Sequence, residues 1–141
     1  MAAIVVGYDG SDCGRAALEE GLGLATALGD RVVVVFGYAP PGLWGGEIVE
    51  HAEAIEELGG KVLEEARARV ESSQVEAEFK LVPSKPSRAL IEVAEATDAR
   101  MIVVGSYGEP PLKGVILGST PNKLLHASDY PVLVVPAKSQ R

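Results

Sequence analysis

The chain has a single cysteine, Cys13, among its 141 residues. One cysteine can form neither an intramolecular disulfide nor a cysteine-built zinc site. A domain of this length buries roughly 68–70% of the surface that its unfolded chain exposes, so a hydrophobic core alone can hold it. The lone thiol also suits a reducing compartment. We therefore expect a cytoplasmic protein in which Cys13 is a small buried residue.

Long hydrophobic runs are missing too. No apolar stretch approaches the ~20 residues that a membrane span needs. The first residues, MAAIVVGYDGS, contain neither a basic region nor a long apolar core. We therefore expect no membrane segment and no signal peptide.

Positive charge is scarce. The chain has 13 Lys and Arg against 20 Asp and Glu, a net charge of −7. A nucleic-acid surface needs clustered Lys and Arg to neutralise phosphates, so this composition argues against one. It remains compatible with a single phosphorylated small molecule, which needs only a local pocket.

Several standard site motifs are also absent. No G-x-x-x-x-G-K-[ST] segment is present, which excludes a P-loop NTPase, and no G-x-G-x-x-G follows the first apolar run. His51 and His126 lack metal-ligand spacing, so we expect surface or helix-capping roles for them. No nucleophile stands beside a base, so we expect no dedicated enzyme.

What the chain does contain is a regular alternation of two patterns. β-Branched apolar runs predict strands at 2–8, 31–38, 75–82, 100–104 and 130–135. Helical spacing predicts helices from Ser11 or Asp12 to Gly29, from 47 to about 72, at 86–97 and at about 120–126. Such alternation is typical of one α/β domain, residues 1–141, in which helices cover both faces of a parallel sheet.

Two of these elements carry further detail. The run 75–82 alternates apolar and charged residues, so we expect it at the edge of the sheet. Gly59 and Gly60 should weaken the long helix locally. Its acidic residues are interpreted as a solvated face: Glu50, Glu53, Glu56, Glu57, Glu64 and Glu65.

The segment 105–119, GSYGEPPLKGVILGS, follows a buried strand and contains four glycines. Ligands of parallel sheets bind at the carboxyl ends of the strands. Glycine N–H groups and a following helix N-terminus favour a phosphate there. Glycine by itself fits a phosphate loop and a structural turn equally well. Lys113, the one cation of the segment, fits a phosphate contact or a solvated loop position.

Other residues near this edge have two interpretations each. Asp9 follows the first strand and suits either a ligand contact or a local turn and helix cap. Ser119 suits either a phosphate contact or the N-cap of the next helix. Trp44 suits either a pocket cover or a contact with a second subunit.

The spacing of the glycine segment resembles that of a known family. Gly105, Gly108, Gly118 and Ser119 reproduce G-x2-G-x9-G-[ST], the ATP-binding signature of universal stress proteins. IVVGYDGSD resembles the family's first strand and acidic turn, ARMIVVGSYG the strand before the signature, and YPVLVVP the closing strand. The resemblance covers essentially the whole chain.

The resemblance implies a Rossmann-like, three-layer α/β sandwich of the adenine nucleotide α-hydrolase type, with five parallel strands in the order 3-2-1-4-5. It implies ATP as ligand, with Mg²⁺ held by the phosphates, Asp9 near the ribose and Val35 or Phe36 near the adenine. The predicted nucleotide-contacting residues are Tyr8, Asp9, Val35, Phe36, Val104, Gly105, Gly108, Lys113, Gly118, Ser119 and Thr120.

The resemblance also implies a homodimer joined through the last strand, at Val132, Leu133, Val134 and Val135. The apolar run YPVLVV agrees, because it would be a poor exposed edge. The implied role is that of a stress-response sensor or regulator, with at most slow incidental ATP hydrolysis.

One departure from the family pattern supports a different function. Glu109-Pro110-Pro111 follows the second signature glycine, where a carboxylate opposes phosphate and prolines lack an N–H donor. The second hypothesis is a degenerate nucleotide site in a protein that acts through its dimer surface. A third, an adenylating enzyme, would need a Ser-Gly-Gly run that YDGSD lacks.

Overall fold

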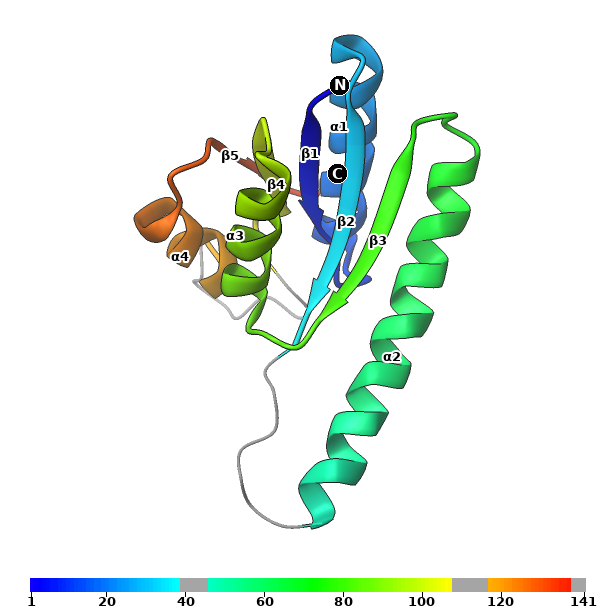
Figure 1. The fold of residues 1–141 in the computed structure, drawn as a ribbon, viewed down its shortest axis with the longest axis vertical. Coiled ribbons are helices and arrows are strands. Elements are labelled where there is room, and N and C mark those ends of the chain that lie inside the picture. Colours follow the sequence, from blue (N-terminus) through cyan, green and yellow to red (C-terminus); the bar gives the residue numbers. More distant parts are fainter. Residues whose placement is uncertain (39–45, 108–116, 138–141) are drawn as a thin grey trace.

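The computed structural model describes residues 1–38, 46–107 and 117–137, with residues 46–52 as backbone only. Strands and helices alternate along the chain (Figure 1). They are β1 (Ala3–Gly7), α1 (Asp12–Leu28), β2 (Arg31–Gly37), α2 (Gly46–Glu71), β3 (Ala77–Val82), α3 (Pro86–Thr97), β4 (Met101–Gly105), α4 (Ser119–Ala127) and β5 (Val132–Val135).

The strands form one parallel sheet in the order β3-β2-β1-β4-β5. This confirms the expected fold class and strand order. β1 pairs with β2 on one side and with β4 on the other, so the strand order reverses beside β1. A reversal of this kind is where such sheets bind ligands.

Two hydrophobic clusters, one on each face of the sheet, form the core. Ile4 and Val6 of β1 pack with α1 and α2, and the alternate residues Ala3 and Val5 pack with α3 and α4. Burial on both faces explains why the central strands are continuous apolar runs. β3 is an outer strand, as its alternating pattern predicted.

Helix and strand ends follow from local chemistry. Ser11 is the N-cap of α1, where its side chain accepts a hydrogen bond from the Gly14 N–H, and Gly29 closes the helix in the left-handed conformation. β5 begins later than expected because the Ser128 hydroxyl bonds Tyr130 and holds a turn before it. α3 spans the predicted residues 86–97.

Helix α2 runs through Gly59 and Gly60 without interruption. A Cβ atom at Gly59 would lie 2.6 Å from the Leu81 side chain and 2.8 Å from the Phe36 ring. The glycine therefore lets α2 approach β2 and β3 closely. The sequence suggested only that Gly59 would weaken the helix and gave no sign of this packing role. In Figure 1 the first turns of α2 extend past the carboxyl ends of these strands.

The amino-terminal edge of the sheet is held by an ion pair between the exposed Arg100 and the buried Asp30. Arg100 donates from Nε to Asp30 Oδ2 at 2.5 Å and from a second guanidinium nitrogen to Oδ1 at 3.2 Å. The Ala2 N–H donates to Oδ1 as well. The side chain of Asp30 is 2% exposed, and the hydrogen bonds from Arg100 lower the pKa of its carboxyl group. These contacts join the starts of β1, β2 and β4.

Candidate nucleotide site

A cavity of about 160 Å³ lies at the carboxyl-terminal edge of the sheet. It is bounded by the ends of β1, β2 and β4, by the start of α3 and by the start of α4. The volume is below the roughly 300–1000 Å³ of typical ligand pockets, so the enclosed part suits one portion of a nucleotide. Its lining residues are Gly7, Tyr8, Asp9, Gly14, Val35, Phe36, Gly37, Pro86, Leu90, Val104, Gly105, Tyr107, Gly118, Ser119, Thr120 and Pro121.

Most of the predicted nucleotide-contacting residues border this cavity. They are Tyr8, Asp9, Val35, Phe36, Val104, Gly105, Gly118, Ser119 and Thr120. Gly108 and Lys113 lie outside the described residues, as do Glu109, Pro110, Pro111 and Trp44. The side chain of His51 lies outside them too.

The wall formed by β2, β4 and α3 is apolar. Val35, Leu90 and Val104 belong to the core cluster on the α3 and α4 face, the side on which the cavity opens. The ring of Phe36 instead packs near Gly59 of α2, on the opposite face of the sheet. Of the two candidates for an adenine contact, only Val35 therefore points its side chain toward the cavity face.

The first turn of α4 forms the polar side of the cavity. Gly118 is the N-cap and Ser119 the first helical residue, so the N-cap interpretation of Ser119 was wrong. The N-cap residue of this helix makes no side-chain capping hydrogen bond. The hydroxyl groups of Ser119 and Thr120 therefore do not serve as caps. A helix N-terminus with free N–H groups attracts anions.

The two ends of the glycine segment are tied together. The Gly118 N–H donates to the Ser106 carbonyl at 2.6 Å, and the Ser106 N–H donates to the Val135 carbonyl at 2.9 Å. Ser106 is buried, and its hydroxyl lies 3.6 Å from the Cys13 sulfur. The start of α4 is thereby fixed beside the end of β4, where the cavity lies.

Gly105 has a packing role that its place in the signature does not reveal. A Cβ there would lie 2.6–2.8 Å from the Cβ and backbone atoms of Cys13 in α1. The glycine is thus required for the approach of α1 to β4, on the face opposite α3. Cys13 is buried, as expected.

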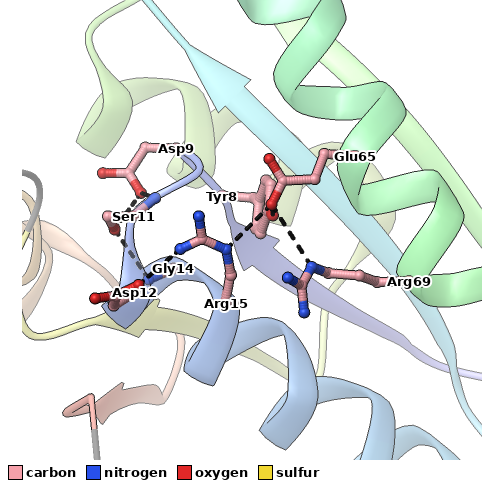
Figure 2. Close-up of polar contacts among 8 residues, drawn as sticks. All are labelled: Tyr8, Asp9, Ser11, Asp12, Gly14, Arg15, Glu65 and Arg69. Atoms are coloured by element: carbon pink, nitrogen blue, oxygen red, sulfur yellow. Dashed lines mark hydrogen bonds and ion pairs between the residues drawn. The ribbon is translucent and has the colours of Figure 1, made fainter.

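Asp9 forms the local turn that one interpretation predicted (Figure 2). Its Oδ1 accepts from the Ser11 N–H at 2.9 Å and from the Ser11 hydroxyl at 2.5 Å. Gly10 supports the turn with φ +81°. Asp9 is nevertheless exposed and lines the cavity, and within the described residues its Oδ2 has no hydrogen-bond partner. The turn and a ligand contact can therefore coexist.

Tyr8 points away from the cavity. Its hydroxyl donates to Glu65 of α2 at 2.7 Å, and the same carboxylate oxygen accepts from Arg15 and pairs with Arg69 (Figure 2). Burial, followed by the bond to Glu65, raises the pKa of Tyr8 to about 12. The Tyr8 bond and the Arg15 pairing lower the pKa of Glu65. Tyr8 thus anchors α2 and borders the cavity next to Asp9.

Two glutamates of α2 therefore do more than form a solvated face. Besides Glu65, Glu56 accepts a hydrogen bond from the Tyr38 hydroxyl at 2.8 Å, and this bond raises the pKa of Tyr38. Glu53, Glu57 and Glu64 are exposed, as interpreted. The sequence did contain a signal for the Tyr8 contact with α2. Tyr8 alternates with Ile4 and Val6 along the strand and so lies on the face that α1 and α2 cover.

Sequence reasoning missed several lining residues. Tyr107 follows Ser106 directly and lines the cavity. Pro86 and Leu90 of α3 complete the apolar wall, and Gly7 and Gly37 end their strands there. Pro86 and Leu90 lie far along the chain from β1 and β2 and reach the cavity only through the fold, so no local motif marks them.

Neither a metal centre nor a membrane helix is found in the part of the chain that the structure describes. There, no three His, Cys, Asp or Glu side chains gather as a metal site would require. None of the described helices combines the length and apolarity needed to span a bilayer.

The predicted dimer residues form the outer strand β5. Val135 is buried and Leu133 is 38% exposed, with Val132 and Val134 half-buried. Within residues 1–38, 46–107 and 117–137, the strand pairs with β4 on one side only.

Comparison with known proteins identifies the family. The family model described as "Universal stress protein family" matches residues 1–136. The chain belongs to the universal stress protein family. A universal stress protein of Methanocaldococcus jannaschii is 26% identical over 94% of this chain and 80% of its own length.

Solved universal stress proteins share the fold. One in complex with cAMP has a TM-score of 0.75 and 27% identity, with 97% of this chain and 98% of that chain covered. One from Archaeoglobus fulgidus in complex with dAMP has a TM-score of 0.70 and 22% identity, with 96% and 98% covered. Adenine nucleotides therefore bind to related universal stress proteins.

Proposed function

We propose that this universal stress protein binds an adenine nucleotide in the cavity and acts as a homodimeric stress-response sensor or regulator. The observation that carries the proposal is one cavity that joins an apolar wall to a helix N-terminus, beside the reversal of strand order. The bound cAMP of a related structure supports the ligand class.

Each part of the cavity suits one part of the nucleotide. The apolar wall around Val35 and Leu90 would hold the adenine, whose faces are apolar. The free oxygen of Asp9 would accept hydrogen bonds from ribose hydroxyls. The N–H and hydroxyl groups of Ser119 and Thr120 would hold phosphate oxygens. With ATP as ligand, Mg²⁺ would offset phosphate charge and be held by the phosphates.

The proposed role is regulatory because the described lining offers no catalytic pair. Asp9 is the only carboxylate among the described lining residues, and these residues include no His, Cys or Lys. A general base must lie within hydrogen-bonding reach of the proton that it removes, and Asp9 already accepts two hydrogen bonds in its turn. Any ATP hydrolysis would be slow and incidental, and the protein would work in the cytoplasm.

Calorimetric titration with AMP and with ATP plus Mg²⁺ tests the binding. We expect saturable heat with wild-type protein and none with Gly118→Val. Gly118 lines the cavity, and its φ of −69° is one that any residue adopts, so a valine there adds bulk beside the cavity without backbone strain. Gly23→Val in α1 is the matched control, because a Cβ there meets no atom within 4 Å.

No heat at millimolar nucleotide from folded wild-type protein would overturn the binding proposal. That result would favour the alternative, a protein-interaction module with a degenerate nucleotide site. Mass spectrometry of any nucleotide that co-purifies with the protein gives an independent test of nucleotide binding.

The dimer is proposed from the outer strand β5. Leu133 is exposed, and among the described residues no strand pairs with the outer side of β5, so a second copy can cover this edge. Sedimentation should give a dimer at micromolar concentration, and Leu133→Lys should shift it to monomer. A wild-type monomer under these conditions would overturn this assembly.

A further inference from the structure

The turn that brings Asp9 to the cavity is held from outside by helix α2. Tyr8 precedes the turn, directly after β1, and Arg15 follows it in the first turn of α1. One oxygen of Glu65, Oε1, accepts from the Tyr8 hydroxyl at 2.7 Å and from Arg15 Nε at 3.1 Å (Figure 2). A single carboxylate of α2 therefore joins both flanks of the turn.

The tip of the turn also lies beside α2. Gly10 has φ +81°, and a Cβ atom built on it would lie 3.6 Å from the Val62 side chain, an ordinary contact distance. Val62 precedes Glu65 by three residues, so the two side chains lie on the same side of the helix. α2 is thus placed against the tip of the turn and bonded to both flanks, although neither Val62 nor Glu65 is among the lining residues of the cavity.

Hydrogen bonds inside the turn connect its flanks to the Asp9 carboxylate. Asp9 Oδ1 accepts from the Ser11 N–H at 2.9 Å, and the Ser11 hydroxyl accepts from the N–H of Gly14, a lining residue, at 3.0 Å. The Ser11 carbonyl accepts from the Arg15 N–H at 2.9 Å. Because each residue is bonded to the next, a shift of either flank would change the direction of the carboxylate. Binding groups depend on supporting contacts of this kind.

We propose that Glu65 is a positioning residue of the nucleotide site, which directs the Asp9 carboxylate toward the ribose hydroxyls. It acts through its bonds to Tyr8 and Arg15, the two flanks of the turn. This role rests on the proposed function and adds to that site a residue of α2. Loss of Glu65 should therefore weaken the part of the affinity that the ribose hydroxyls contribute. A purely structural Glu65 would affect stability and leave that part unchanged.

Calorimetric titration with AMP and with 2′,3′-dideoxy-AMP tests this role. The two ligands differ only in the ribose hydroxyls, so contacts to the base and to the phosphate cancel in the ratio of their dissociation constants. We expect wild-type protein to bind AMP about tenfold more tightly, because hydrogen bonds to a carboxylate are stronger than neutral ones. In Glu65→Ala this preference should fall to about threefold or less, since the Asp9 turn loses its support.

Glu64→Ala is the matched control. Glu64 is the neighbour of Glu65 on α2, and its removal takes away the same charge. Its side chain is 73% exposed and pairs with Arg67 rather than with the turn. The preference for AMP should therefore stay at the wild-type value. A wild-type preference in folded Glu65→Ala, or an equal loss in both variants, would contradict the positioning role.

Two milder variants decide the question if Glu65→Ala does not fold. Glu65→Gln keeps an acceptor oxygen at the same reach but loses the charge that faces Arg15, and Tyr8→Phe loses the bond at one flank only. In both, the preference for AMP should lie between those of wild type and about threefold. A wild-type preference in both variants would contradict the role of Glu65.

The wild-type titrations separate this role from the proposed function. Equal affinity for AMP and 2′,3′-dideoxy-AMP would show that the ribose hydroxyls contribute nothing. That result would overturn the positioning role and leave nucleotide binding intact. No heat from either ligand would overturn the proposed function and the positioning role with it.

Discussion

The two ends of the central strands differ in how they use a carboxylate. At the amino-terminal edge, both oxygens of Asp30 accept hydrogen bonds, from Arg100 and from the Ala2 N–H, and the side chain is buried. At the carboxyl-terminal edge, Asp9 uses Oδ1 in a turn and is exposed at a cavity. The carboxylate oxygens of Asp30 both accept hydrogen bonds within the protein, whereas Asp9 keeps one carboxylate oxygen that could accept a hydrogen bond from a ligand.

The comparison of Asp30 with Asp9 separates a polar group that stabilises the fold from one that is available for ligand binding. Burial of a charged group is unfavourable unless partners compensate it, so a buried carboxylate with a full set of partners stabilises the strands around it. An exposed carboxylate needs no such partners. Asp30 and Asp9 should therefore respond oppositely when stability and ligand binding are measured side by side.

The largest effect on stability is expected for Asp30→Asn. The amide loses the charge that two guanidinium N–H groups contact, and its NH₂ group faces those donors. We expect the free energy of unfolding to fall by about 2 kcal/mol in urea titrations. The exposed Asp129→Asn should change it by less than about 0.5 kcal/mol. Equal effects of the two variants would contradict a structural role for Asp30.

The pH dependence of stability should show the same contrast. The pKa of Asp30 is lowered in the folded state, first by the hydrogen bonds from Arg100. Its contribution is therefore present above the unfolded-state value of about 3.9 and is lost as the pH falls toward the folded value. Unfolding free energies measured from pH 7 to pH 3 should show the gap between wild type and Asp30→Asn narrowing below about pH 4.

A smaller effect is expected for Tyr8→Phe, which removes an internal hydrogen bond at the carboxyl-terminal edge. Loss of the bond to Glu65 should lower stability by about 1 kcal/mol, because Glu65 keeps Arg15 and Arg69 as partners. Tyr130→Phe is the control, since no hydrogen bond of its hydroxyl is found within the described residues.

The free energy of unfolding, measured at alkaline pH, gives a second test of the Tyr8 hydrogen bond. Its pKa is raised to about 12, so its contribution is complete below the unfolded-state value of about 10 and is lost as the pH rises toward 12. The stability gap between wild type and Tyr8→Phe should close over that range. A gap that persists above pH 12 would contradict the contribution assigned to the hydrogen bond between Tyr8 and Glu65.

The smallest effect on stability is expected for Asp9→Asn. Asparagine also forms such turns, so the unfolding free energy should change by less than about 0.5 kcal/mol. Urea titrations run beside those of Asp30→Asn measure the difference directly. A loss as large as that of Asp30→Asn would place Asp9 among the structural carboxylates and remove the contrast between the two edges.

Much of the fold could be predicted because its signals are local. The apolar runs gave every strand to within two residues, and Ser11, Gly29 and Pro86 marked helix ends through backbone chemistry that acts over a few residues. The strand order was expected only through the resemblance to universal stress proteins, and the sheet confirms it. Most residues suggested by the signature do border one cavity.

Other features could not be predicted because they depend on contacts between distant segments. Phe36 and Tyr8 border the cavity, yet their side chains pack on the opposite face. Gly59 and Gly105 are explained by close approaches of α2 and α1 to the sheet. The Asp30–Arg100 pair joins residues 70 positions apart.

The sequence by itself determined the alternation of strands and helices, the ends of α1 at Ser11 and Gly29, and the glycine spacing, since each depends on neighbouring residues. Only the tertiary structure decided which side chains share the cavity, which glycine serves packing and which carboxylate is buried. The reason is physical: the face of the sheet on which a residue lies, and what packs against that face, follow from how the strands pair and where the helices settle. Asp9 and Asp30 look alike as residues, and their surroundings make one available to a ligand and the other part of the core.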